Sequence, residues 1–143
     1  MTLEEIRSNI RYNEGLLNQY SAQKSNIERK LTGLDTLKQK ISALQFDLEK
    51  RQEERIKHLC KYDLKPIRNK IYSRYFEGMH VLLSGTQFHH VYEGLTSAKQ
   101  ITQNRIHQVL QELNECEGRI SQCRESIDYW NMQLKLLPSE EGI

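Results

Sequence analysis

The chain has 143 residues, of which 37% are hydrophobic and 28% charged, with seven glycines, two prolines and a formal net charge of +2. This length allows at most one ordinary domain. The composition excludes a thick globular core and is typical of long amphipathic helices that bury narrow stripes. We expect no Sec-type signal peptide, because the first residues carry two acids and no apolar block. We also expect no membrane span, because the longest apolar run is Val81–Leu83 and a span needs about 20 apolar residues.

A first long helix is predicted from about residue 3 to about residue 61. Its apolar residues form one stripe with steps of three or four positions, widened to seven where the polar Asn13 and Lys24 interrupt it: Ile6, Ile10, Leu17, Tyr20, Ile27, Leu31, Leu34, Leu37, Ile41, Leu44 and Leu48. Two successive steps of three, ending at Leu37, are expected to shift the stripe around the helix before the 3–4 spacing resumes. Such a helix is on the order of 85 Å long if straight, so it must lie along another long helix.

A short helix is predicted next, from about residue 66 to about residue 83. Asp63 and Pro66 indicate a restart, because proline is tolerated in a first helical turn and pushes the preceding residue out of the helical region. The triplet Ser84-Gly85-Thr86 then predicts a glycine C-cap that runs directly into a threonine N-cap.

A second long helix is predicted from about residue 86 to about residue 137, before Pro138 and Gly142 begin a short tail. Its apolar residues alternate steps of three and four: Ile106, Val109, Leu113, Cys116, Ile120, Cys123, Ile127, Trp130, Leu134 and Leu137. This heptad pattern predicts a left-handed supercoil against another helix.

Two of the three cysteines, Cys116 and Cys123, occupy positions of this heptad pattern. We therefore expect them to be small buried residues and not metal ligands or nucleophiles. Seven residues on one helix separate their Cα atoms by roughly 10 Å, which is too far for a disulfide, so reduced thiols are expected, Cys60 included.

The predicted fold is a single all-α domain covering residues 1–143. It is an elongated antiparallel hairpin of two long helices with coiled-coil-like packing, and the short helix between them holds an aromatic-glycine corner at Phe76 and Gly78. A lone hairpin leaves each long helix exposed on its other side, so self-association or a helical protein partner is expected. The expected interface residues are Ile27, Leu31, Leu34, Leu37, Ile41, Leu44, Leu48, Ile106, Val109, Leu113, Ile120, Ile127, Trp130 and Leu134.

Motifs for catalysis or cofactor binding are missing from the sequence, which has no P-loop, G-x-G-x-x-G, H-E-x-x-H or C-x-x-C pattern. His89 and Glu93 are four residues apart on a predicted helix and could share a metal, but we interpret them as a solvated pair. We therefore expect no catalytic, cofactor or metal site, and a protein that is not an enzyme.

Charge is unevenly distributed along the chain. Residues 55–74 contain seven Lys or Arg and one acid, whereas residues 112–143 contain seven acids and three bases. Solvated helix faces explain both runs, and pairing with a copy or a relative is the alternative. Tyrosines interleave the basic run, so a nucleic-acid-binding coiled coil is a third hypothesis; Ile56 and Leu59 thread the same run at helical spacing and predict an ordinary basic helix surface instead.

The segment Phe76-Glu77-Gly78 resembles the W-x-G signature of helical-hairpin proteins that Gram-positive type VII systems secrete. In its layout of a long helix, an aromatic-glycine segment and a final regular helix, the chain is similar to the YwqH-like group encoded beside LXG toxins. The resemblance implies a targeting partner, or chaperone, that binds the helical N-terminal domain of an LXG toxin for type VII secretion. It also implies a protein made in the cytoplasm and exported, if at all, without a Sec signal peptide.

Two departures qualify what the resemblance implies. Phe76 stands where the signature has tryptophan, and the Y-x-x-x-D/E export signal is missing, because Gln133 lies four residues after Tyr129 and Thr96 four after Tyr92. The chain would then work beside a toxin or a second small helical protein that supplies the signal. The alternative hypothesis is a self-associating coiled-coil scaffold unrelated to secretion.

Overall fold

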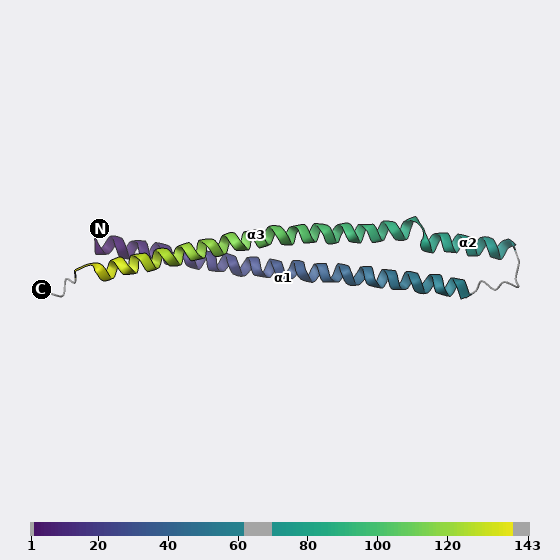
Figure 1. The fold of residues 1–143 in the computed structure, drawn as a ribbon, viewed down its shortest axis with the longest axis horizontal. Helices are drawn as coiled ribbons and strands as arrows, with labels where there is room; N and C mark the ends of the chain where they lie inside the picture. Colours follow the sequence, from purple (N-terminus) through teal and green to yellow (C-terminus); the bar gives the residue numbers. More distant parts are fainter. Residues whose placement is uncertain (1, 62–69, 139–143) are drawn as a thin grey trace. The chain divides into compact units, whose positions relative to one another are not determined.

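The computed structural model describes residues 2–61 and 70–138, apart from the side chains of residues 60, 61, 70–72 and 82–84. Three helices follow one another: α1 (Leu3–Lys61), α2 (Lys70–Ser84) and α3 (Thr86–Leu136) (Figure 1). These ranges contain no strand. The predicted all-α fold with two long helices packed as a hairpin is confirmed.

The ends of the long helices coincide with the sequence-based expectations to within one residue. The helix restart expected at Asp63 and Pro66, and the tail residue Gly142, lie outside the described residues.

A reciprocal capping box begins α1. The backbone N–H of Glu5 donates to Thr2 Oγ1 at 3.2 Å, and the backbone N–H of Thr2 donates to Glu5 Oε2 at 2.9 Å. The first helical hydrogen bond runs from the N–H of Ile6 to the carbonyl of Thr2 at 3.1 Å. Two of the amides that a helix start leaves without partners are thereby satisfied, and the carboxylate of Glu5 also complements the positive end of the helix dipole.

A single residue, Gly85, separates α2 from α3. Its carbonyl accepts a hydrogen bond from the N–H of His89 at 3.4 Å, so Gly85 is the N-cap of α3 and Thr86 is the first helical residue. The prediction that Thr86 is the N-cap was wrong by one residue. No described glycine has a positive φ, so Gly85 is not a left-handed cap either. Glycine is needed because a Cβ there would lie 2.1 Å from the carbonyl oxygen of Val81.

The chain divides into two compact units. Unit 1 combines Met1–Gly33 with Ile106–Ile143, and unit 2 is the continuous segment Leu34–Arg105. The long helices α1 and α3 each contribute to both units, whereas α2 belongs to unit 2.

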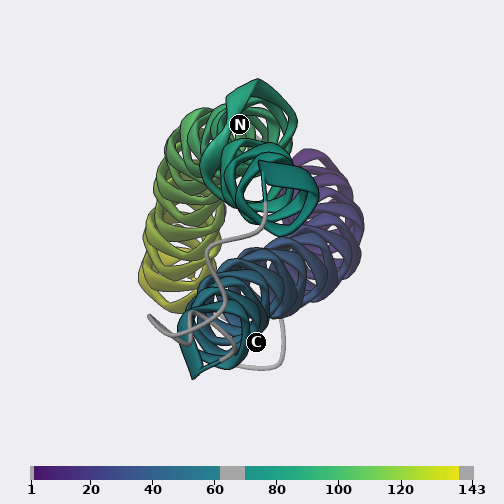
Figure 2. The same cartoon turned by 90° about the vertical axis from the view of Figure 1, so that its right-hand side faces the viewer.

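In unit 1 the beginning of α1 and the end of α3 lie side by side and run in opposite directions (Figures 1 and 2). The Arg119 guanidinium lies 5.8 Å from the centre of the Tyr20 ring, and one turn further along α1 the Lys24 ammonium lies 3.6 Å from Glu117. The two helices bury an apolar seam: Ile6, Val109, Cys116, Ile120 and Cys123 are at most 7% exposed.

In unit 2 the paired segments of α1 and α3 are also antiparallel. Gln45 contacts Thr96, and further along α1 Glu49 contacts Tyr92. Burial is thinner here, because Ile41 and Leu59 are the hydrophobic residues of this unit that are buried among its described side chains, and the polar Gln45 and Thr102 are buried with them.

Candidate protein-binding surface

The predicted interface residues of α3 are used within the chain itself. Val109 and Ile120 are buried, and Ile106, Leu113, Ile127, Trp130 and Leu134 are half-buried. They follow the 3–4 spacing along the face that α1 covers in unit 1. In unit 1 this seam therefore packs α3 against α1 within the chain itself.

The predicted interface residues of α1 are divided between the two units. Unit 1 contains α1 as far as Gly33, so Ile27 and Leu31 lie in the unit of this seam. The others belong to unit 2: Leu34, Leu37, Ile41, Leu44 and Leu48.

The expected shift of the α1 stripe at Leu37 is wrong. Ile27, Leu31, Leu34 and Leu48 are half-buried and Ile41 is buried, but Leu37 is 45% and Leu44 is 56% exposed. Apart from Ser42, which is half-buried next to Ile41, the buried or half-buried residues from Leu31 to Gln52 instead continue the 3–4 spacing without a shift: Leu31, Leu34, Lys38, Ile41, Gln45, Leu48 and Gln52. Constant spacing keeps one face of α1 toward α3, so polar residues occupy the seam and two leucines lie beside it.

Three polar residues spaced seven apart, Lys38, Gln45 and Gln52, therefore lie in the seam of unit 2. The Lys38 ammonium donates to Gln103 Oε1, and Gln45 Nε2 donates to Thr96 Oγ1 at 2.8 Å. The Nε2 of Gln52 is buried without a hydrogen-bond partner. Buried polar groups of this kind set register at a cost in stability.

Hydrogen bonds between α1 and α3 lie along one edge of unit 2. They join Lys38 to Gln103, Gln45 to Thr96 and Glu49 to Tyr92. We call these six residues the polar edge. The Thr96 hydroxyl also donates to the carbonyl of Tyr92 at 3.1 Å. The Tyr92 side chain is hydrogen-bonded to the Glu49 carboxylate, and this bond, together with the negative charge of Glu49, raises the pKa of Tyr92. The polar edge thus links α1 to α3 at successive turns.

The opposite edge of unit 2 is apolar. Leu44 and Leu48 of α1 line a shallow groove together with Val91 and Leu95 of α3. Leu37 lies one heptad before Leu44, and Ala98 lies one heptad after Val91, so antiparallel pairing extends the same edge in one direction. We call this surface the apolar strip (Leu37, Leu44, Val91, Leu95 and Ala98).

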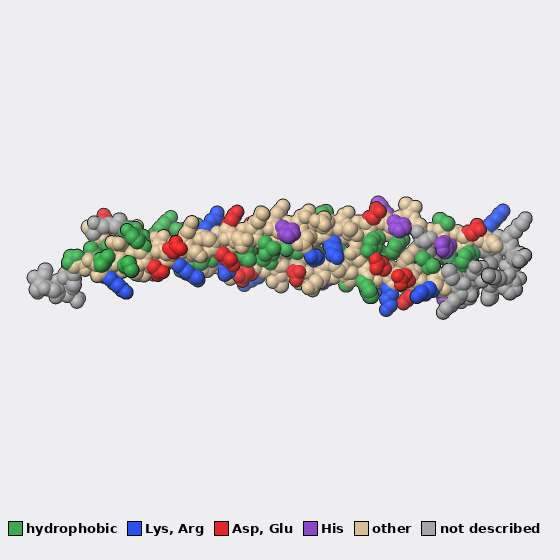
Figure 3. Space-filling model, in the orientation of Figure 1, with side chains coloured by type: hydrophobic (Ala, Val, Ile, Leu, Met, Phe, Trp, Pro, Cys, Tyr) green, Lys and Arg blue, Asp and Glu red, His purple; other side chains and the backbone are tan. Residues whose placement is uncertain are grey.

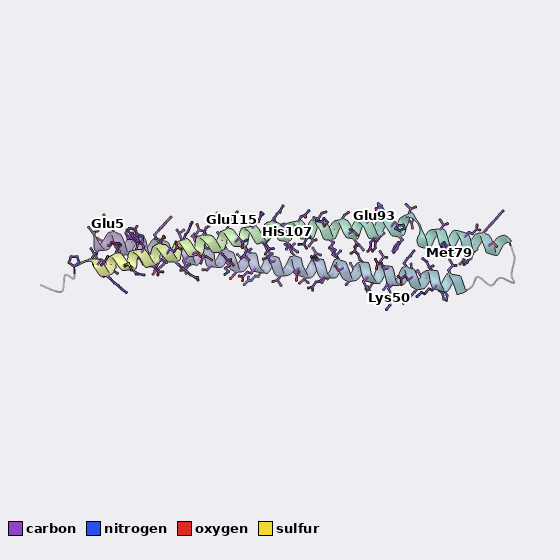
Figure 4. All side chains as sticks on the ribbon, viewed as in Figure 1. Glu5, Lys50, Met79, Glu93, His107 and Glu115 are labelled. Carbon is purple, nitrogen blue, oxygen red and sulfur yellow. The ribbon has the colours of Figure 1, made fainter. Side chains whose placement is uncertain are left out.

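Side chains of the apolar strip reach the surface. Val91 is 51% exposed, and Leu44 is 56% exposed. Hydrophobic side chains appear among charged ones over the part of unit 2 where α1 and α3 lie together (Figure 3). Lys50 and Glu93 point outward from α1 and α3 there (Figure 4), and charged residues on these outer faces are normal for paired helices. Exposed apolar residues that adjoin one another mark an interaction surface more often than isolated ones do.

Unit 1 offers two further candidate surfaces. A polar groove includes Lys24, Glu117 and Arg124, and Lys24 lies within ion-pair distance of both Glu117 and Glu28. Tyr129 and Trp130, whose rings meet edge to face at 5.0 Å, line a second groove with polar residues of α3 alone. Neither surface combines apolar residues from both helices as the apolar strip does.

The cysteine prediction is confirmed for two of the three thiols. Cys116 and Cys123 are free and buried in the seam of unit 1. The Cys116 thiol donates to the backbone carbonyl of Tyr20 at 3.1 Å, so it contributes a contact between α1 and α3. The side chain of Cys60 lies outside the described residues.

The aromatic-glycine pair of the predicted corner lies inside α2. Phe76 is half-buried and stacks on His80 at 6.2 Å between ring centres, one helical turn along. Gly78 has a helical backbone, and a Cβ added to it would meet no atom within 4 Å. The break between helices that the structure describes is at Gly85.

Within residues 2–61 and 70–138, no group of three or more His, Cys, Asp or Glu side chains could hold a metal ion, and His89 and Glu93 belong to no such group. The described helices include none that is long and apolar enough to cross a bilayer. Part of the basic run at residues 55–74 lies outside the described residues.

Comparison of the chain with models of protein families, with curated proteins and with solved structures finds no match. The functional assignment therefore depends on the surface itself and on the resemblance carried by Phe76 and Gly78.

Proposed function

We propose that the chain is a non-enzymatic helical adaptor that binds the helical N-terminal domain of an LXG toxin and directs it to type VII secretion. The observation that carries the binding role is the apolar strip of unit 2, where Leu37, Leu44 and Val91 are each at least 45% exposed. Burying one such side chain fully stabilises a complex by about 1.5–3 kcal/mol relative to leaving it in water. The link to toxin export comes from the resemblance at Phe76 and Gly78.

The adaptor works through packing and not through chemistry. Its own seam in unit 1 is filled by Val109, Cys116 and Ile120, so these side chains are buried without a partner. In unit 2 the polar edge fixes the pairing of α1 and α3, while the apolar strip stays available to a partner. The partner supplies the export signal that this chain lacks.

Co-expression tests the proposal. The tagged chain is produced together with the N-terminal helical domain of an LXG toxin from the same genome, and the complex is purified by the tag and weighed by light scattering. We expect co-elution at a fixed ratio. Separate elution of two folded proteins would refute the toxin partner.

Self-association through the apolar strip is the second candidate function, because the same exposed leucines could cover each other in a coiled-coil scaffold. It predicts a dimer or larger oligomer of the chain alone, with no requirement for a toxin domain. Light scattering on the purified chain separates the two candidates.

A further inference from the structure

Units 1 and 2 bury different kinds of side chain between α1 and α3. We infer that unit 2 is a latch: its segments of α1 and α3 part and pair again in the folded protein, while the seam of unit 1 stays closed. This conformational property goes beyond the proposed function, because the latch would work in the chain alone.

The seam of unit 2 is rich in polar residues. Buried and half-buried positions at steps of three or four give thirteen seam positions on residues 34–59 of α1 and 88–102 of α3. With tyrosine counted as apolar, five of these thirteen are polar: Lys38, Gln45, Gln52, Lys99 and Thr102. Gln45 and Thr102 are the most deeply buried of the five, at 9% and 6% exposed.

The seam of unit 1 is mostly apolar. The same steps give nineteen seam positions on residues 3–31 of α1 and 106–137 of α3, and two of them, Asn13 and Lys24, are polar. Both lie on α1, so the α3 side of this seam is apolar throughout. The polar fraction is therefore several times higher in unit 2.

Parting the helices of unit 2 is inexpensive because water replaces what is lost. The hydrogen bonds from Lys38 to Gln103 and from Gln45 to Thr96 would be exchanged for bonds to water, so each contributes only a small net free energy to the closed state. The Nε2 of Gln52 is buried without a partner and would gain a hydrogen bond on opening. Solvation of the half-buried Lys38 ammonium would also improve.

Parting the helices of unit 1 has no such compensation. Val109, Cys116, Ile120 and Cys123 are at most 6% exposed, and exposing apolar side chains to water is unfavourable. The ion pair between Lys24 and Glu117 joins half-exposed side chains and contributes little in either state. Regions of one protein can open with different free energies, and we expect the lower one in unit 2.

The two states of the latch would present different surfaces. The closed state keeps Ile41 buried and Leu48 and Leu95 half-buried, and the parted state would uncover them. The polar edge defines the closed state, because Gln45 and Thr96 meet only in the observed register. Polar seam residues set register at a cost in stability, so unit 2 combines a defined pairing with a weak hold.

Thiol labelling of the full chain compares the two units directly. Cys116 and Cys123 report on unit 1, and a Thr102→Cys variant adds a thiol to the seam of unit 2; the three positions are 2%, 5% and 6% exposed. The Thr102 hydroxyl donates to the carbonyl of Ala98 in α3 itself, at 2.8 Å. The substitution therefore leaves the hydrogen bonds between α1 and α3 in place.

Protection is the rate of each thiol with an aromatic disulfide reagent in the unfolded chain divided by its rate in the folded chain. Mass spectrometry of peptides assigns the label and separates Cys60 from the other thiols. We expect the thiol introduced by Thr102→Cys to be protected at least about tenfold less than Cys116 and Cys123.

Matched seam variants separate local opening from unfolding of the whole chain. Gln52→Leu, made in the Thr102→Cys background, removes the unpaired amide of unit 2. It should slow labelling of the introduced thiol by about fivefold and leave the rates of Cys116 and Cys123 unchanged. Asn13→Leu is the matched change in unit 1 and should slow Cys116 and Cys123 alone.

Three results would overturn the latch. Equal protection of the three thiols would show that both units open together, and stronger protection of the introduced thiol would make unit 1 the weaker half. A Gln52→Leu variant that slows all three thiols alike, or none of them, would show that unit 2 does not open as a unit of its own. Failure of a toxin domain to bind, with the introduced thiol still labelled faster, would instead refute only the proposed function.

Discussion

Two valines on α3 differ greatly in burial and provide a matched test of the packing. Val109 is 0% exposed in unit 1, and Val91 is 51% exposed in the apolar strip of unit 2. Replacing either with alanine removes the same two methyl groups from the interior of the same helix. The gain in helix propensity, about 0.5 kcal/mol, is therefore common to both variants.

The expected free energies follow from burial. Each buried methyl group contributes about 0.8 kcal/mol, so Val109→Ala loses about 1.6 kcal/mol of transfer free energy, and the cavity left between α1 and α3 brings the total to about 2–3 kcal/mol. Val91→Ala loses at most about half of the transfer free energy and leaves no closed cavity. We expect the unfolding free energies of the two variants to differ by about 1.5 kcal/mol or more.

Guanidinium unfolding measures this difference. It is followed by circular dichroism at 222 nm and by the fluorescence of the single tryptophan, Trp130, which lies in unit 1. Val109→Ala should move the fluorescence transition to lower denaturant, and Val91→Ala should leave it nearly unchanged. Equal shifts for the two variants would refute the burial pattern on which the choice of the apolar strip depends.

Three further predictions concern single contacts. Thr2→Ala removes half of the capping box and should lower stability by about 1 kcal/mol; no change in the thermal midpoint would contradict its role. Gln52→Leu removes a buried, unsatisfied amide and should raise stability by about 1 kcal/mol, and a fall in the midpoint would show that the amide has a partner. Because the Glu49 contact raises the pKa of Tyr92, this tyrosine stabilises the fold below its unfolded pKa, near 10, and the contribution is lost as pH rises through the higher folded pKa. The free energy of unfolding of the Tyr92→Phe variant should therefore fall less steeply than that of the parent as pH rises through this range. Parallel curves of unfolding free energy against pH for parent and variant would argue against the contact.

Local patterns predicted the helices well. The 3–4 spacing from Ile106 to Leu134 is so regular that a helix and its buried face follow directly, and the structure places this face against α1 in unit 1. The capping box was present in the sequence as Thr2-Leu3-Glu4-Glu5, a recognisable S/T-x-x-E signal, but the prediction did not use it.

The apolar strip was missed because hydrophobicity alone was used to trace the stripe on α1. Leu37 and Leu44 are apolar, so the sequence reading placed them in the seam, whereas geometry places Lys38 and Gln45 there. If the constant 3–4 spacing is extended past Leu34, Leu37 and Leu44 fall outside the seam, at the position beside it on α1. The hydrogen bonds that make the polar residues acceptable join positions more than 50 residues apart in the sequence, such as Gln45 and Thr96, and no local pattern contains that information.

Hydrogen exchange on the complex with the toxin's N-terminal domain tests the central proposal, that a partner helix lies on the apolar strip, most directly. Amide exchange is measured by mass spectrometry for the full chain alone and for the complex. Docking predicts slower exchange on binding in peptides covering residues 37–51 and 88–101, with little change in residues 106–136. Slowing confined to residues 106–136, or no slowing in a complex that co-purifies, would contradict it.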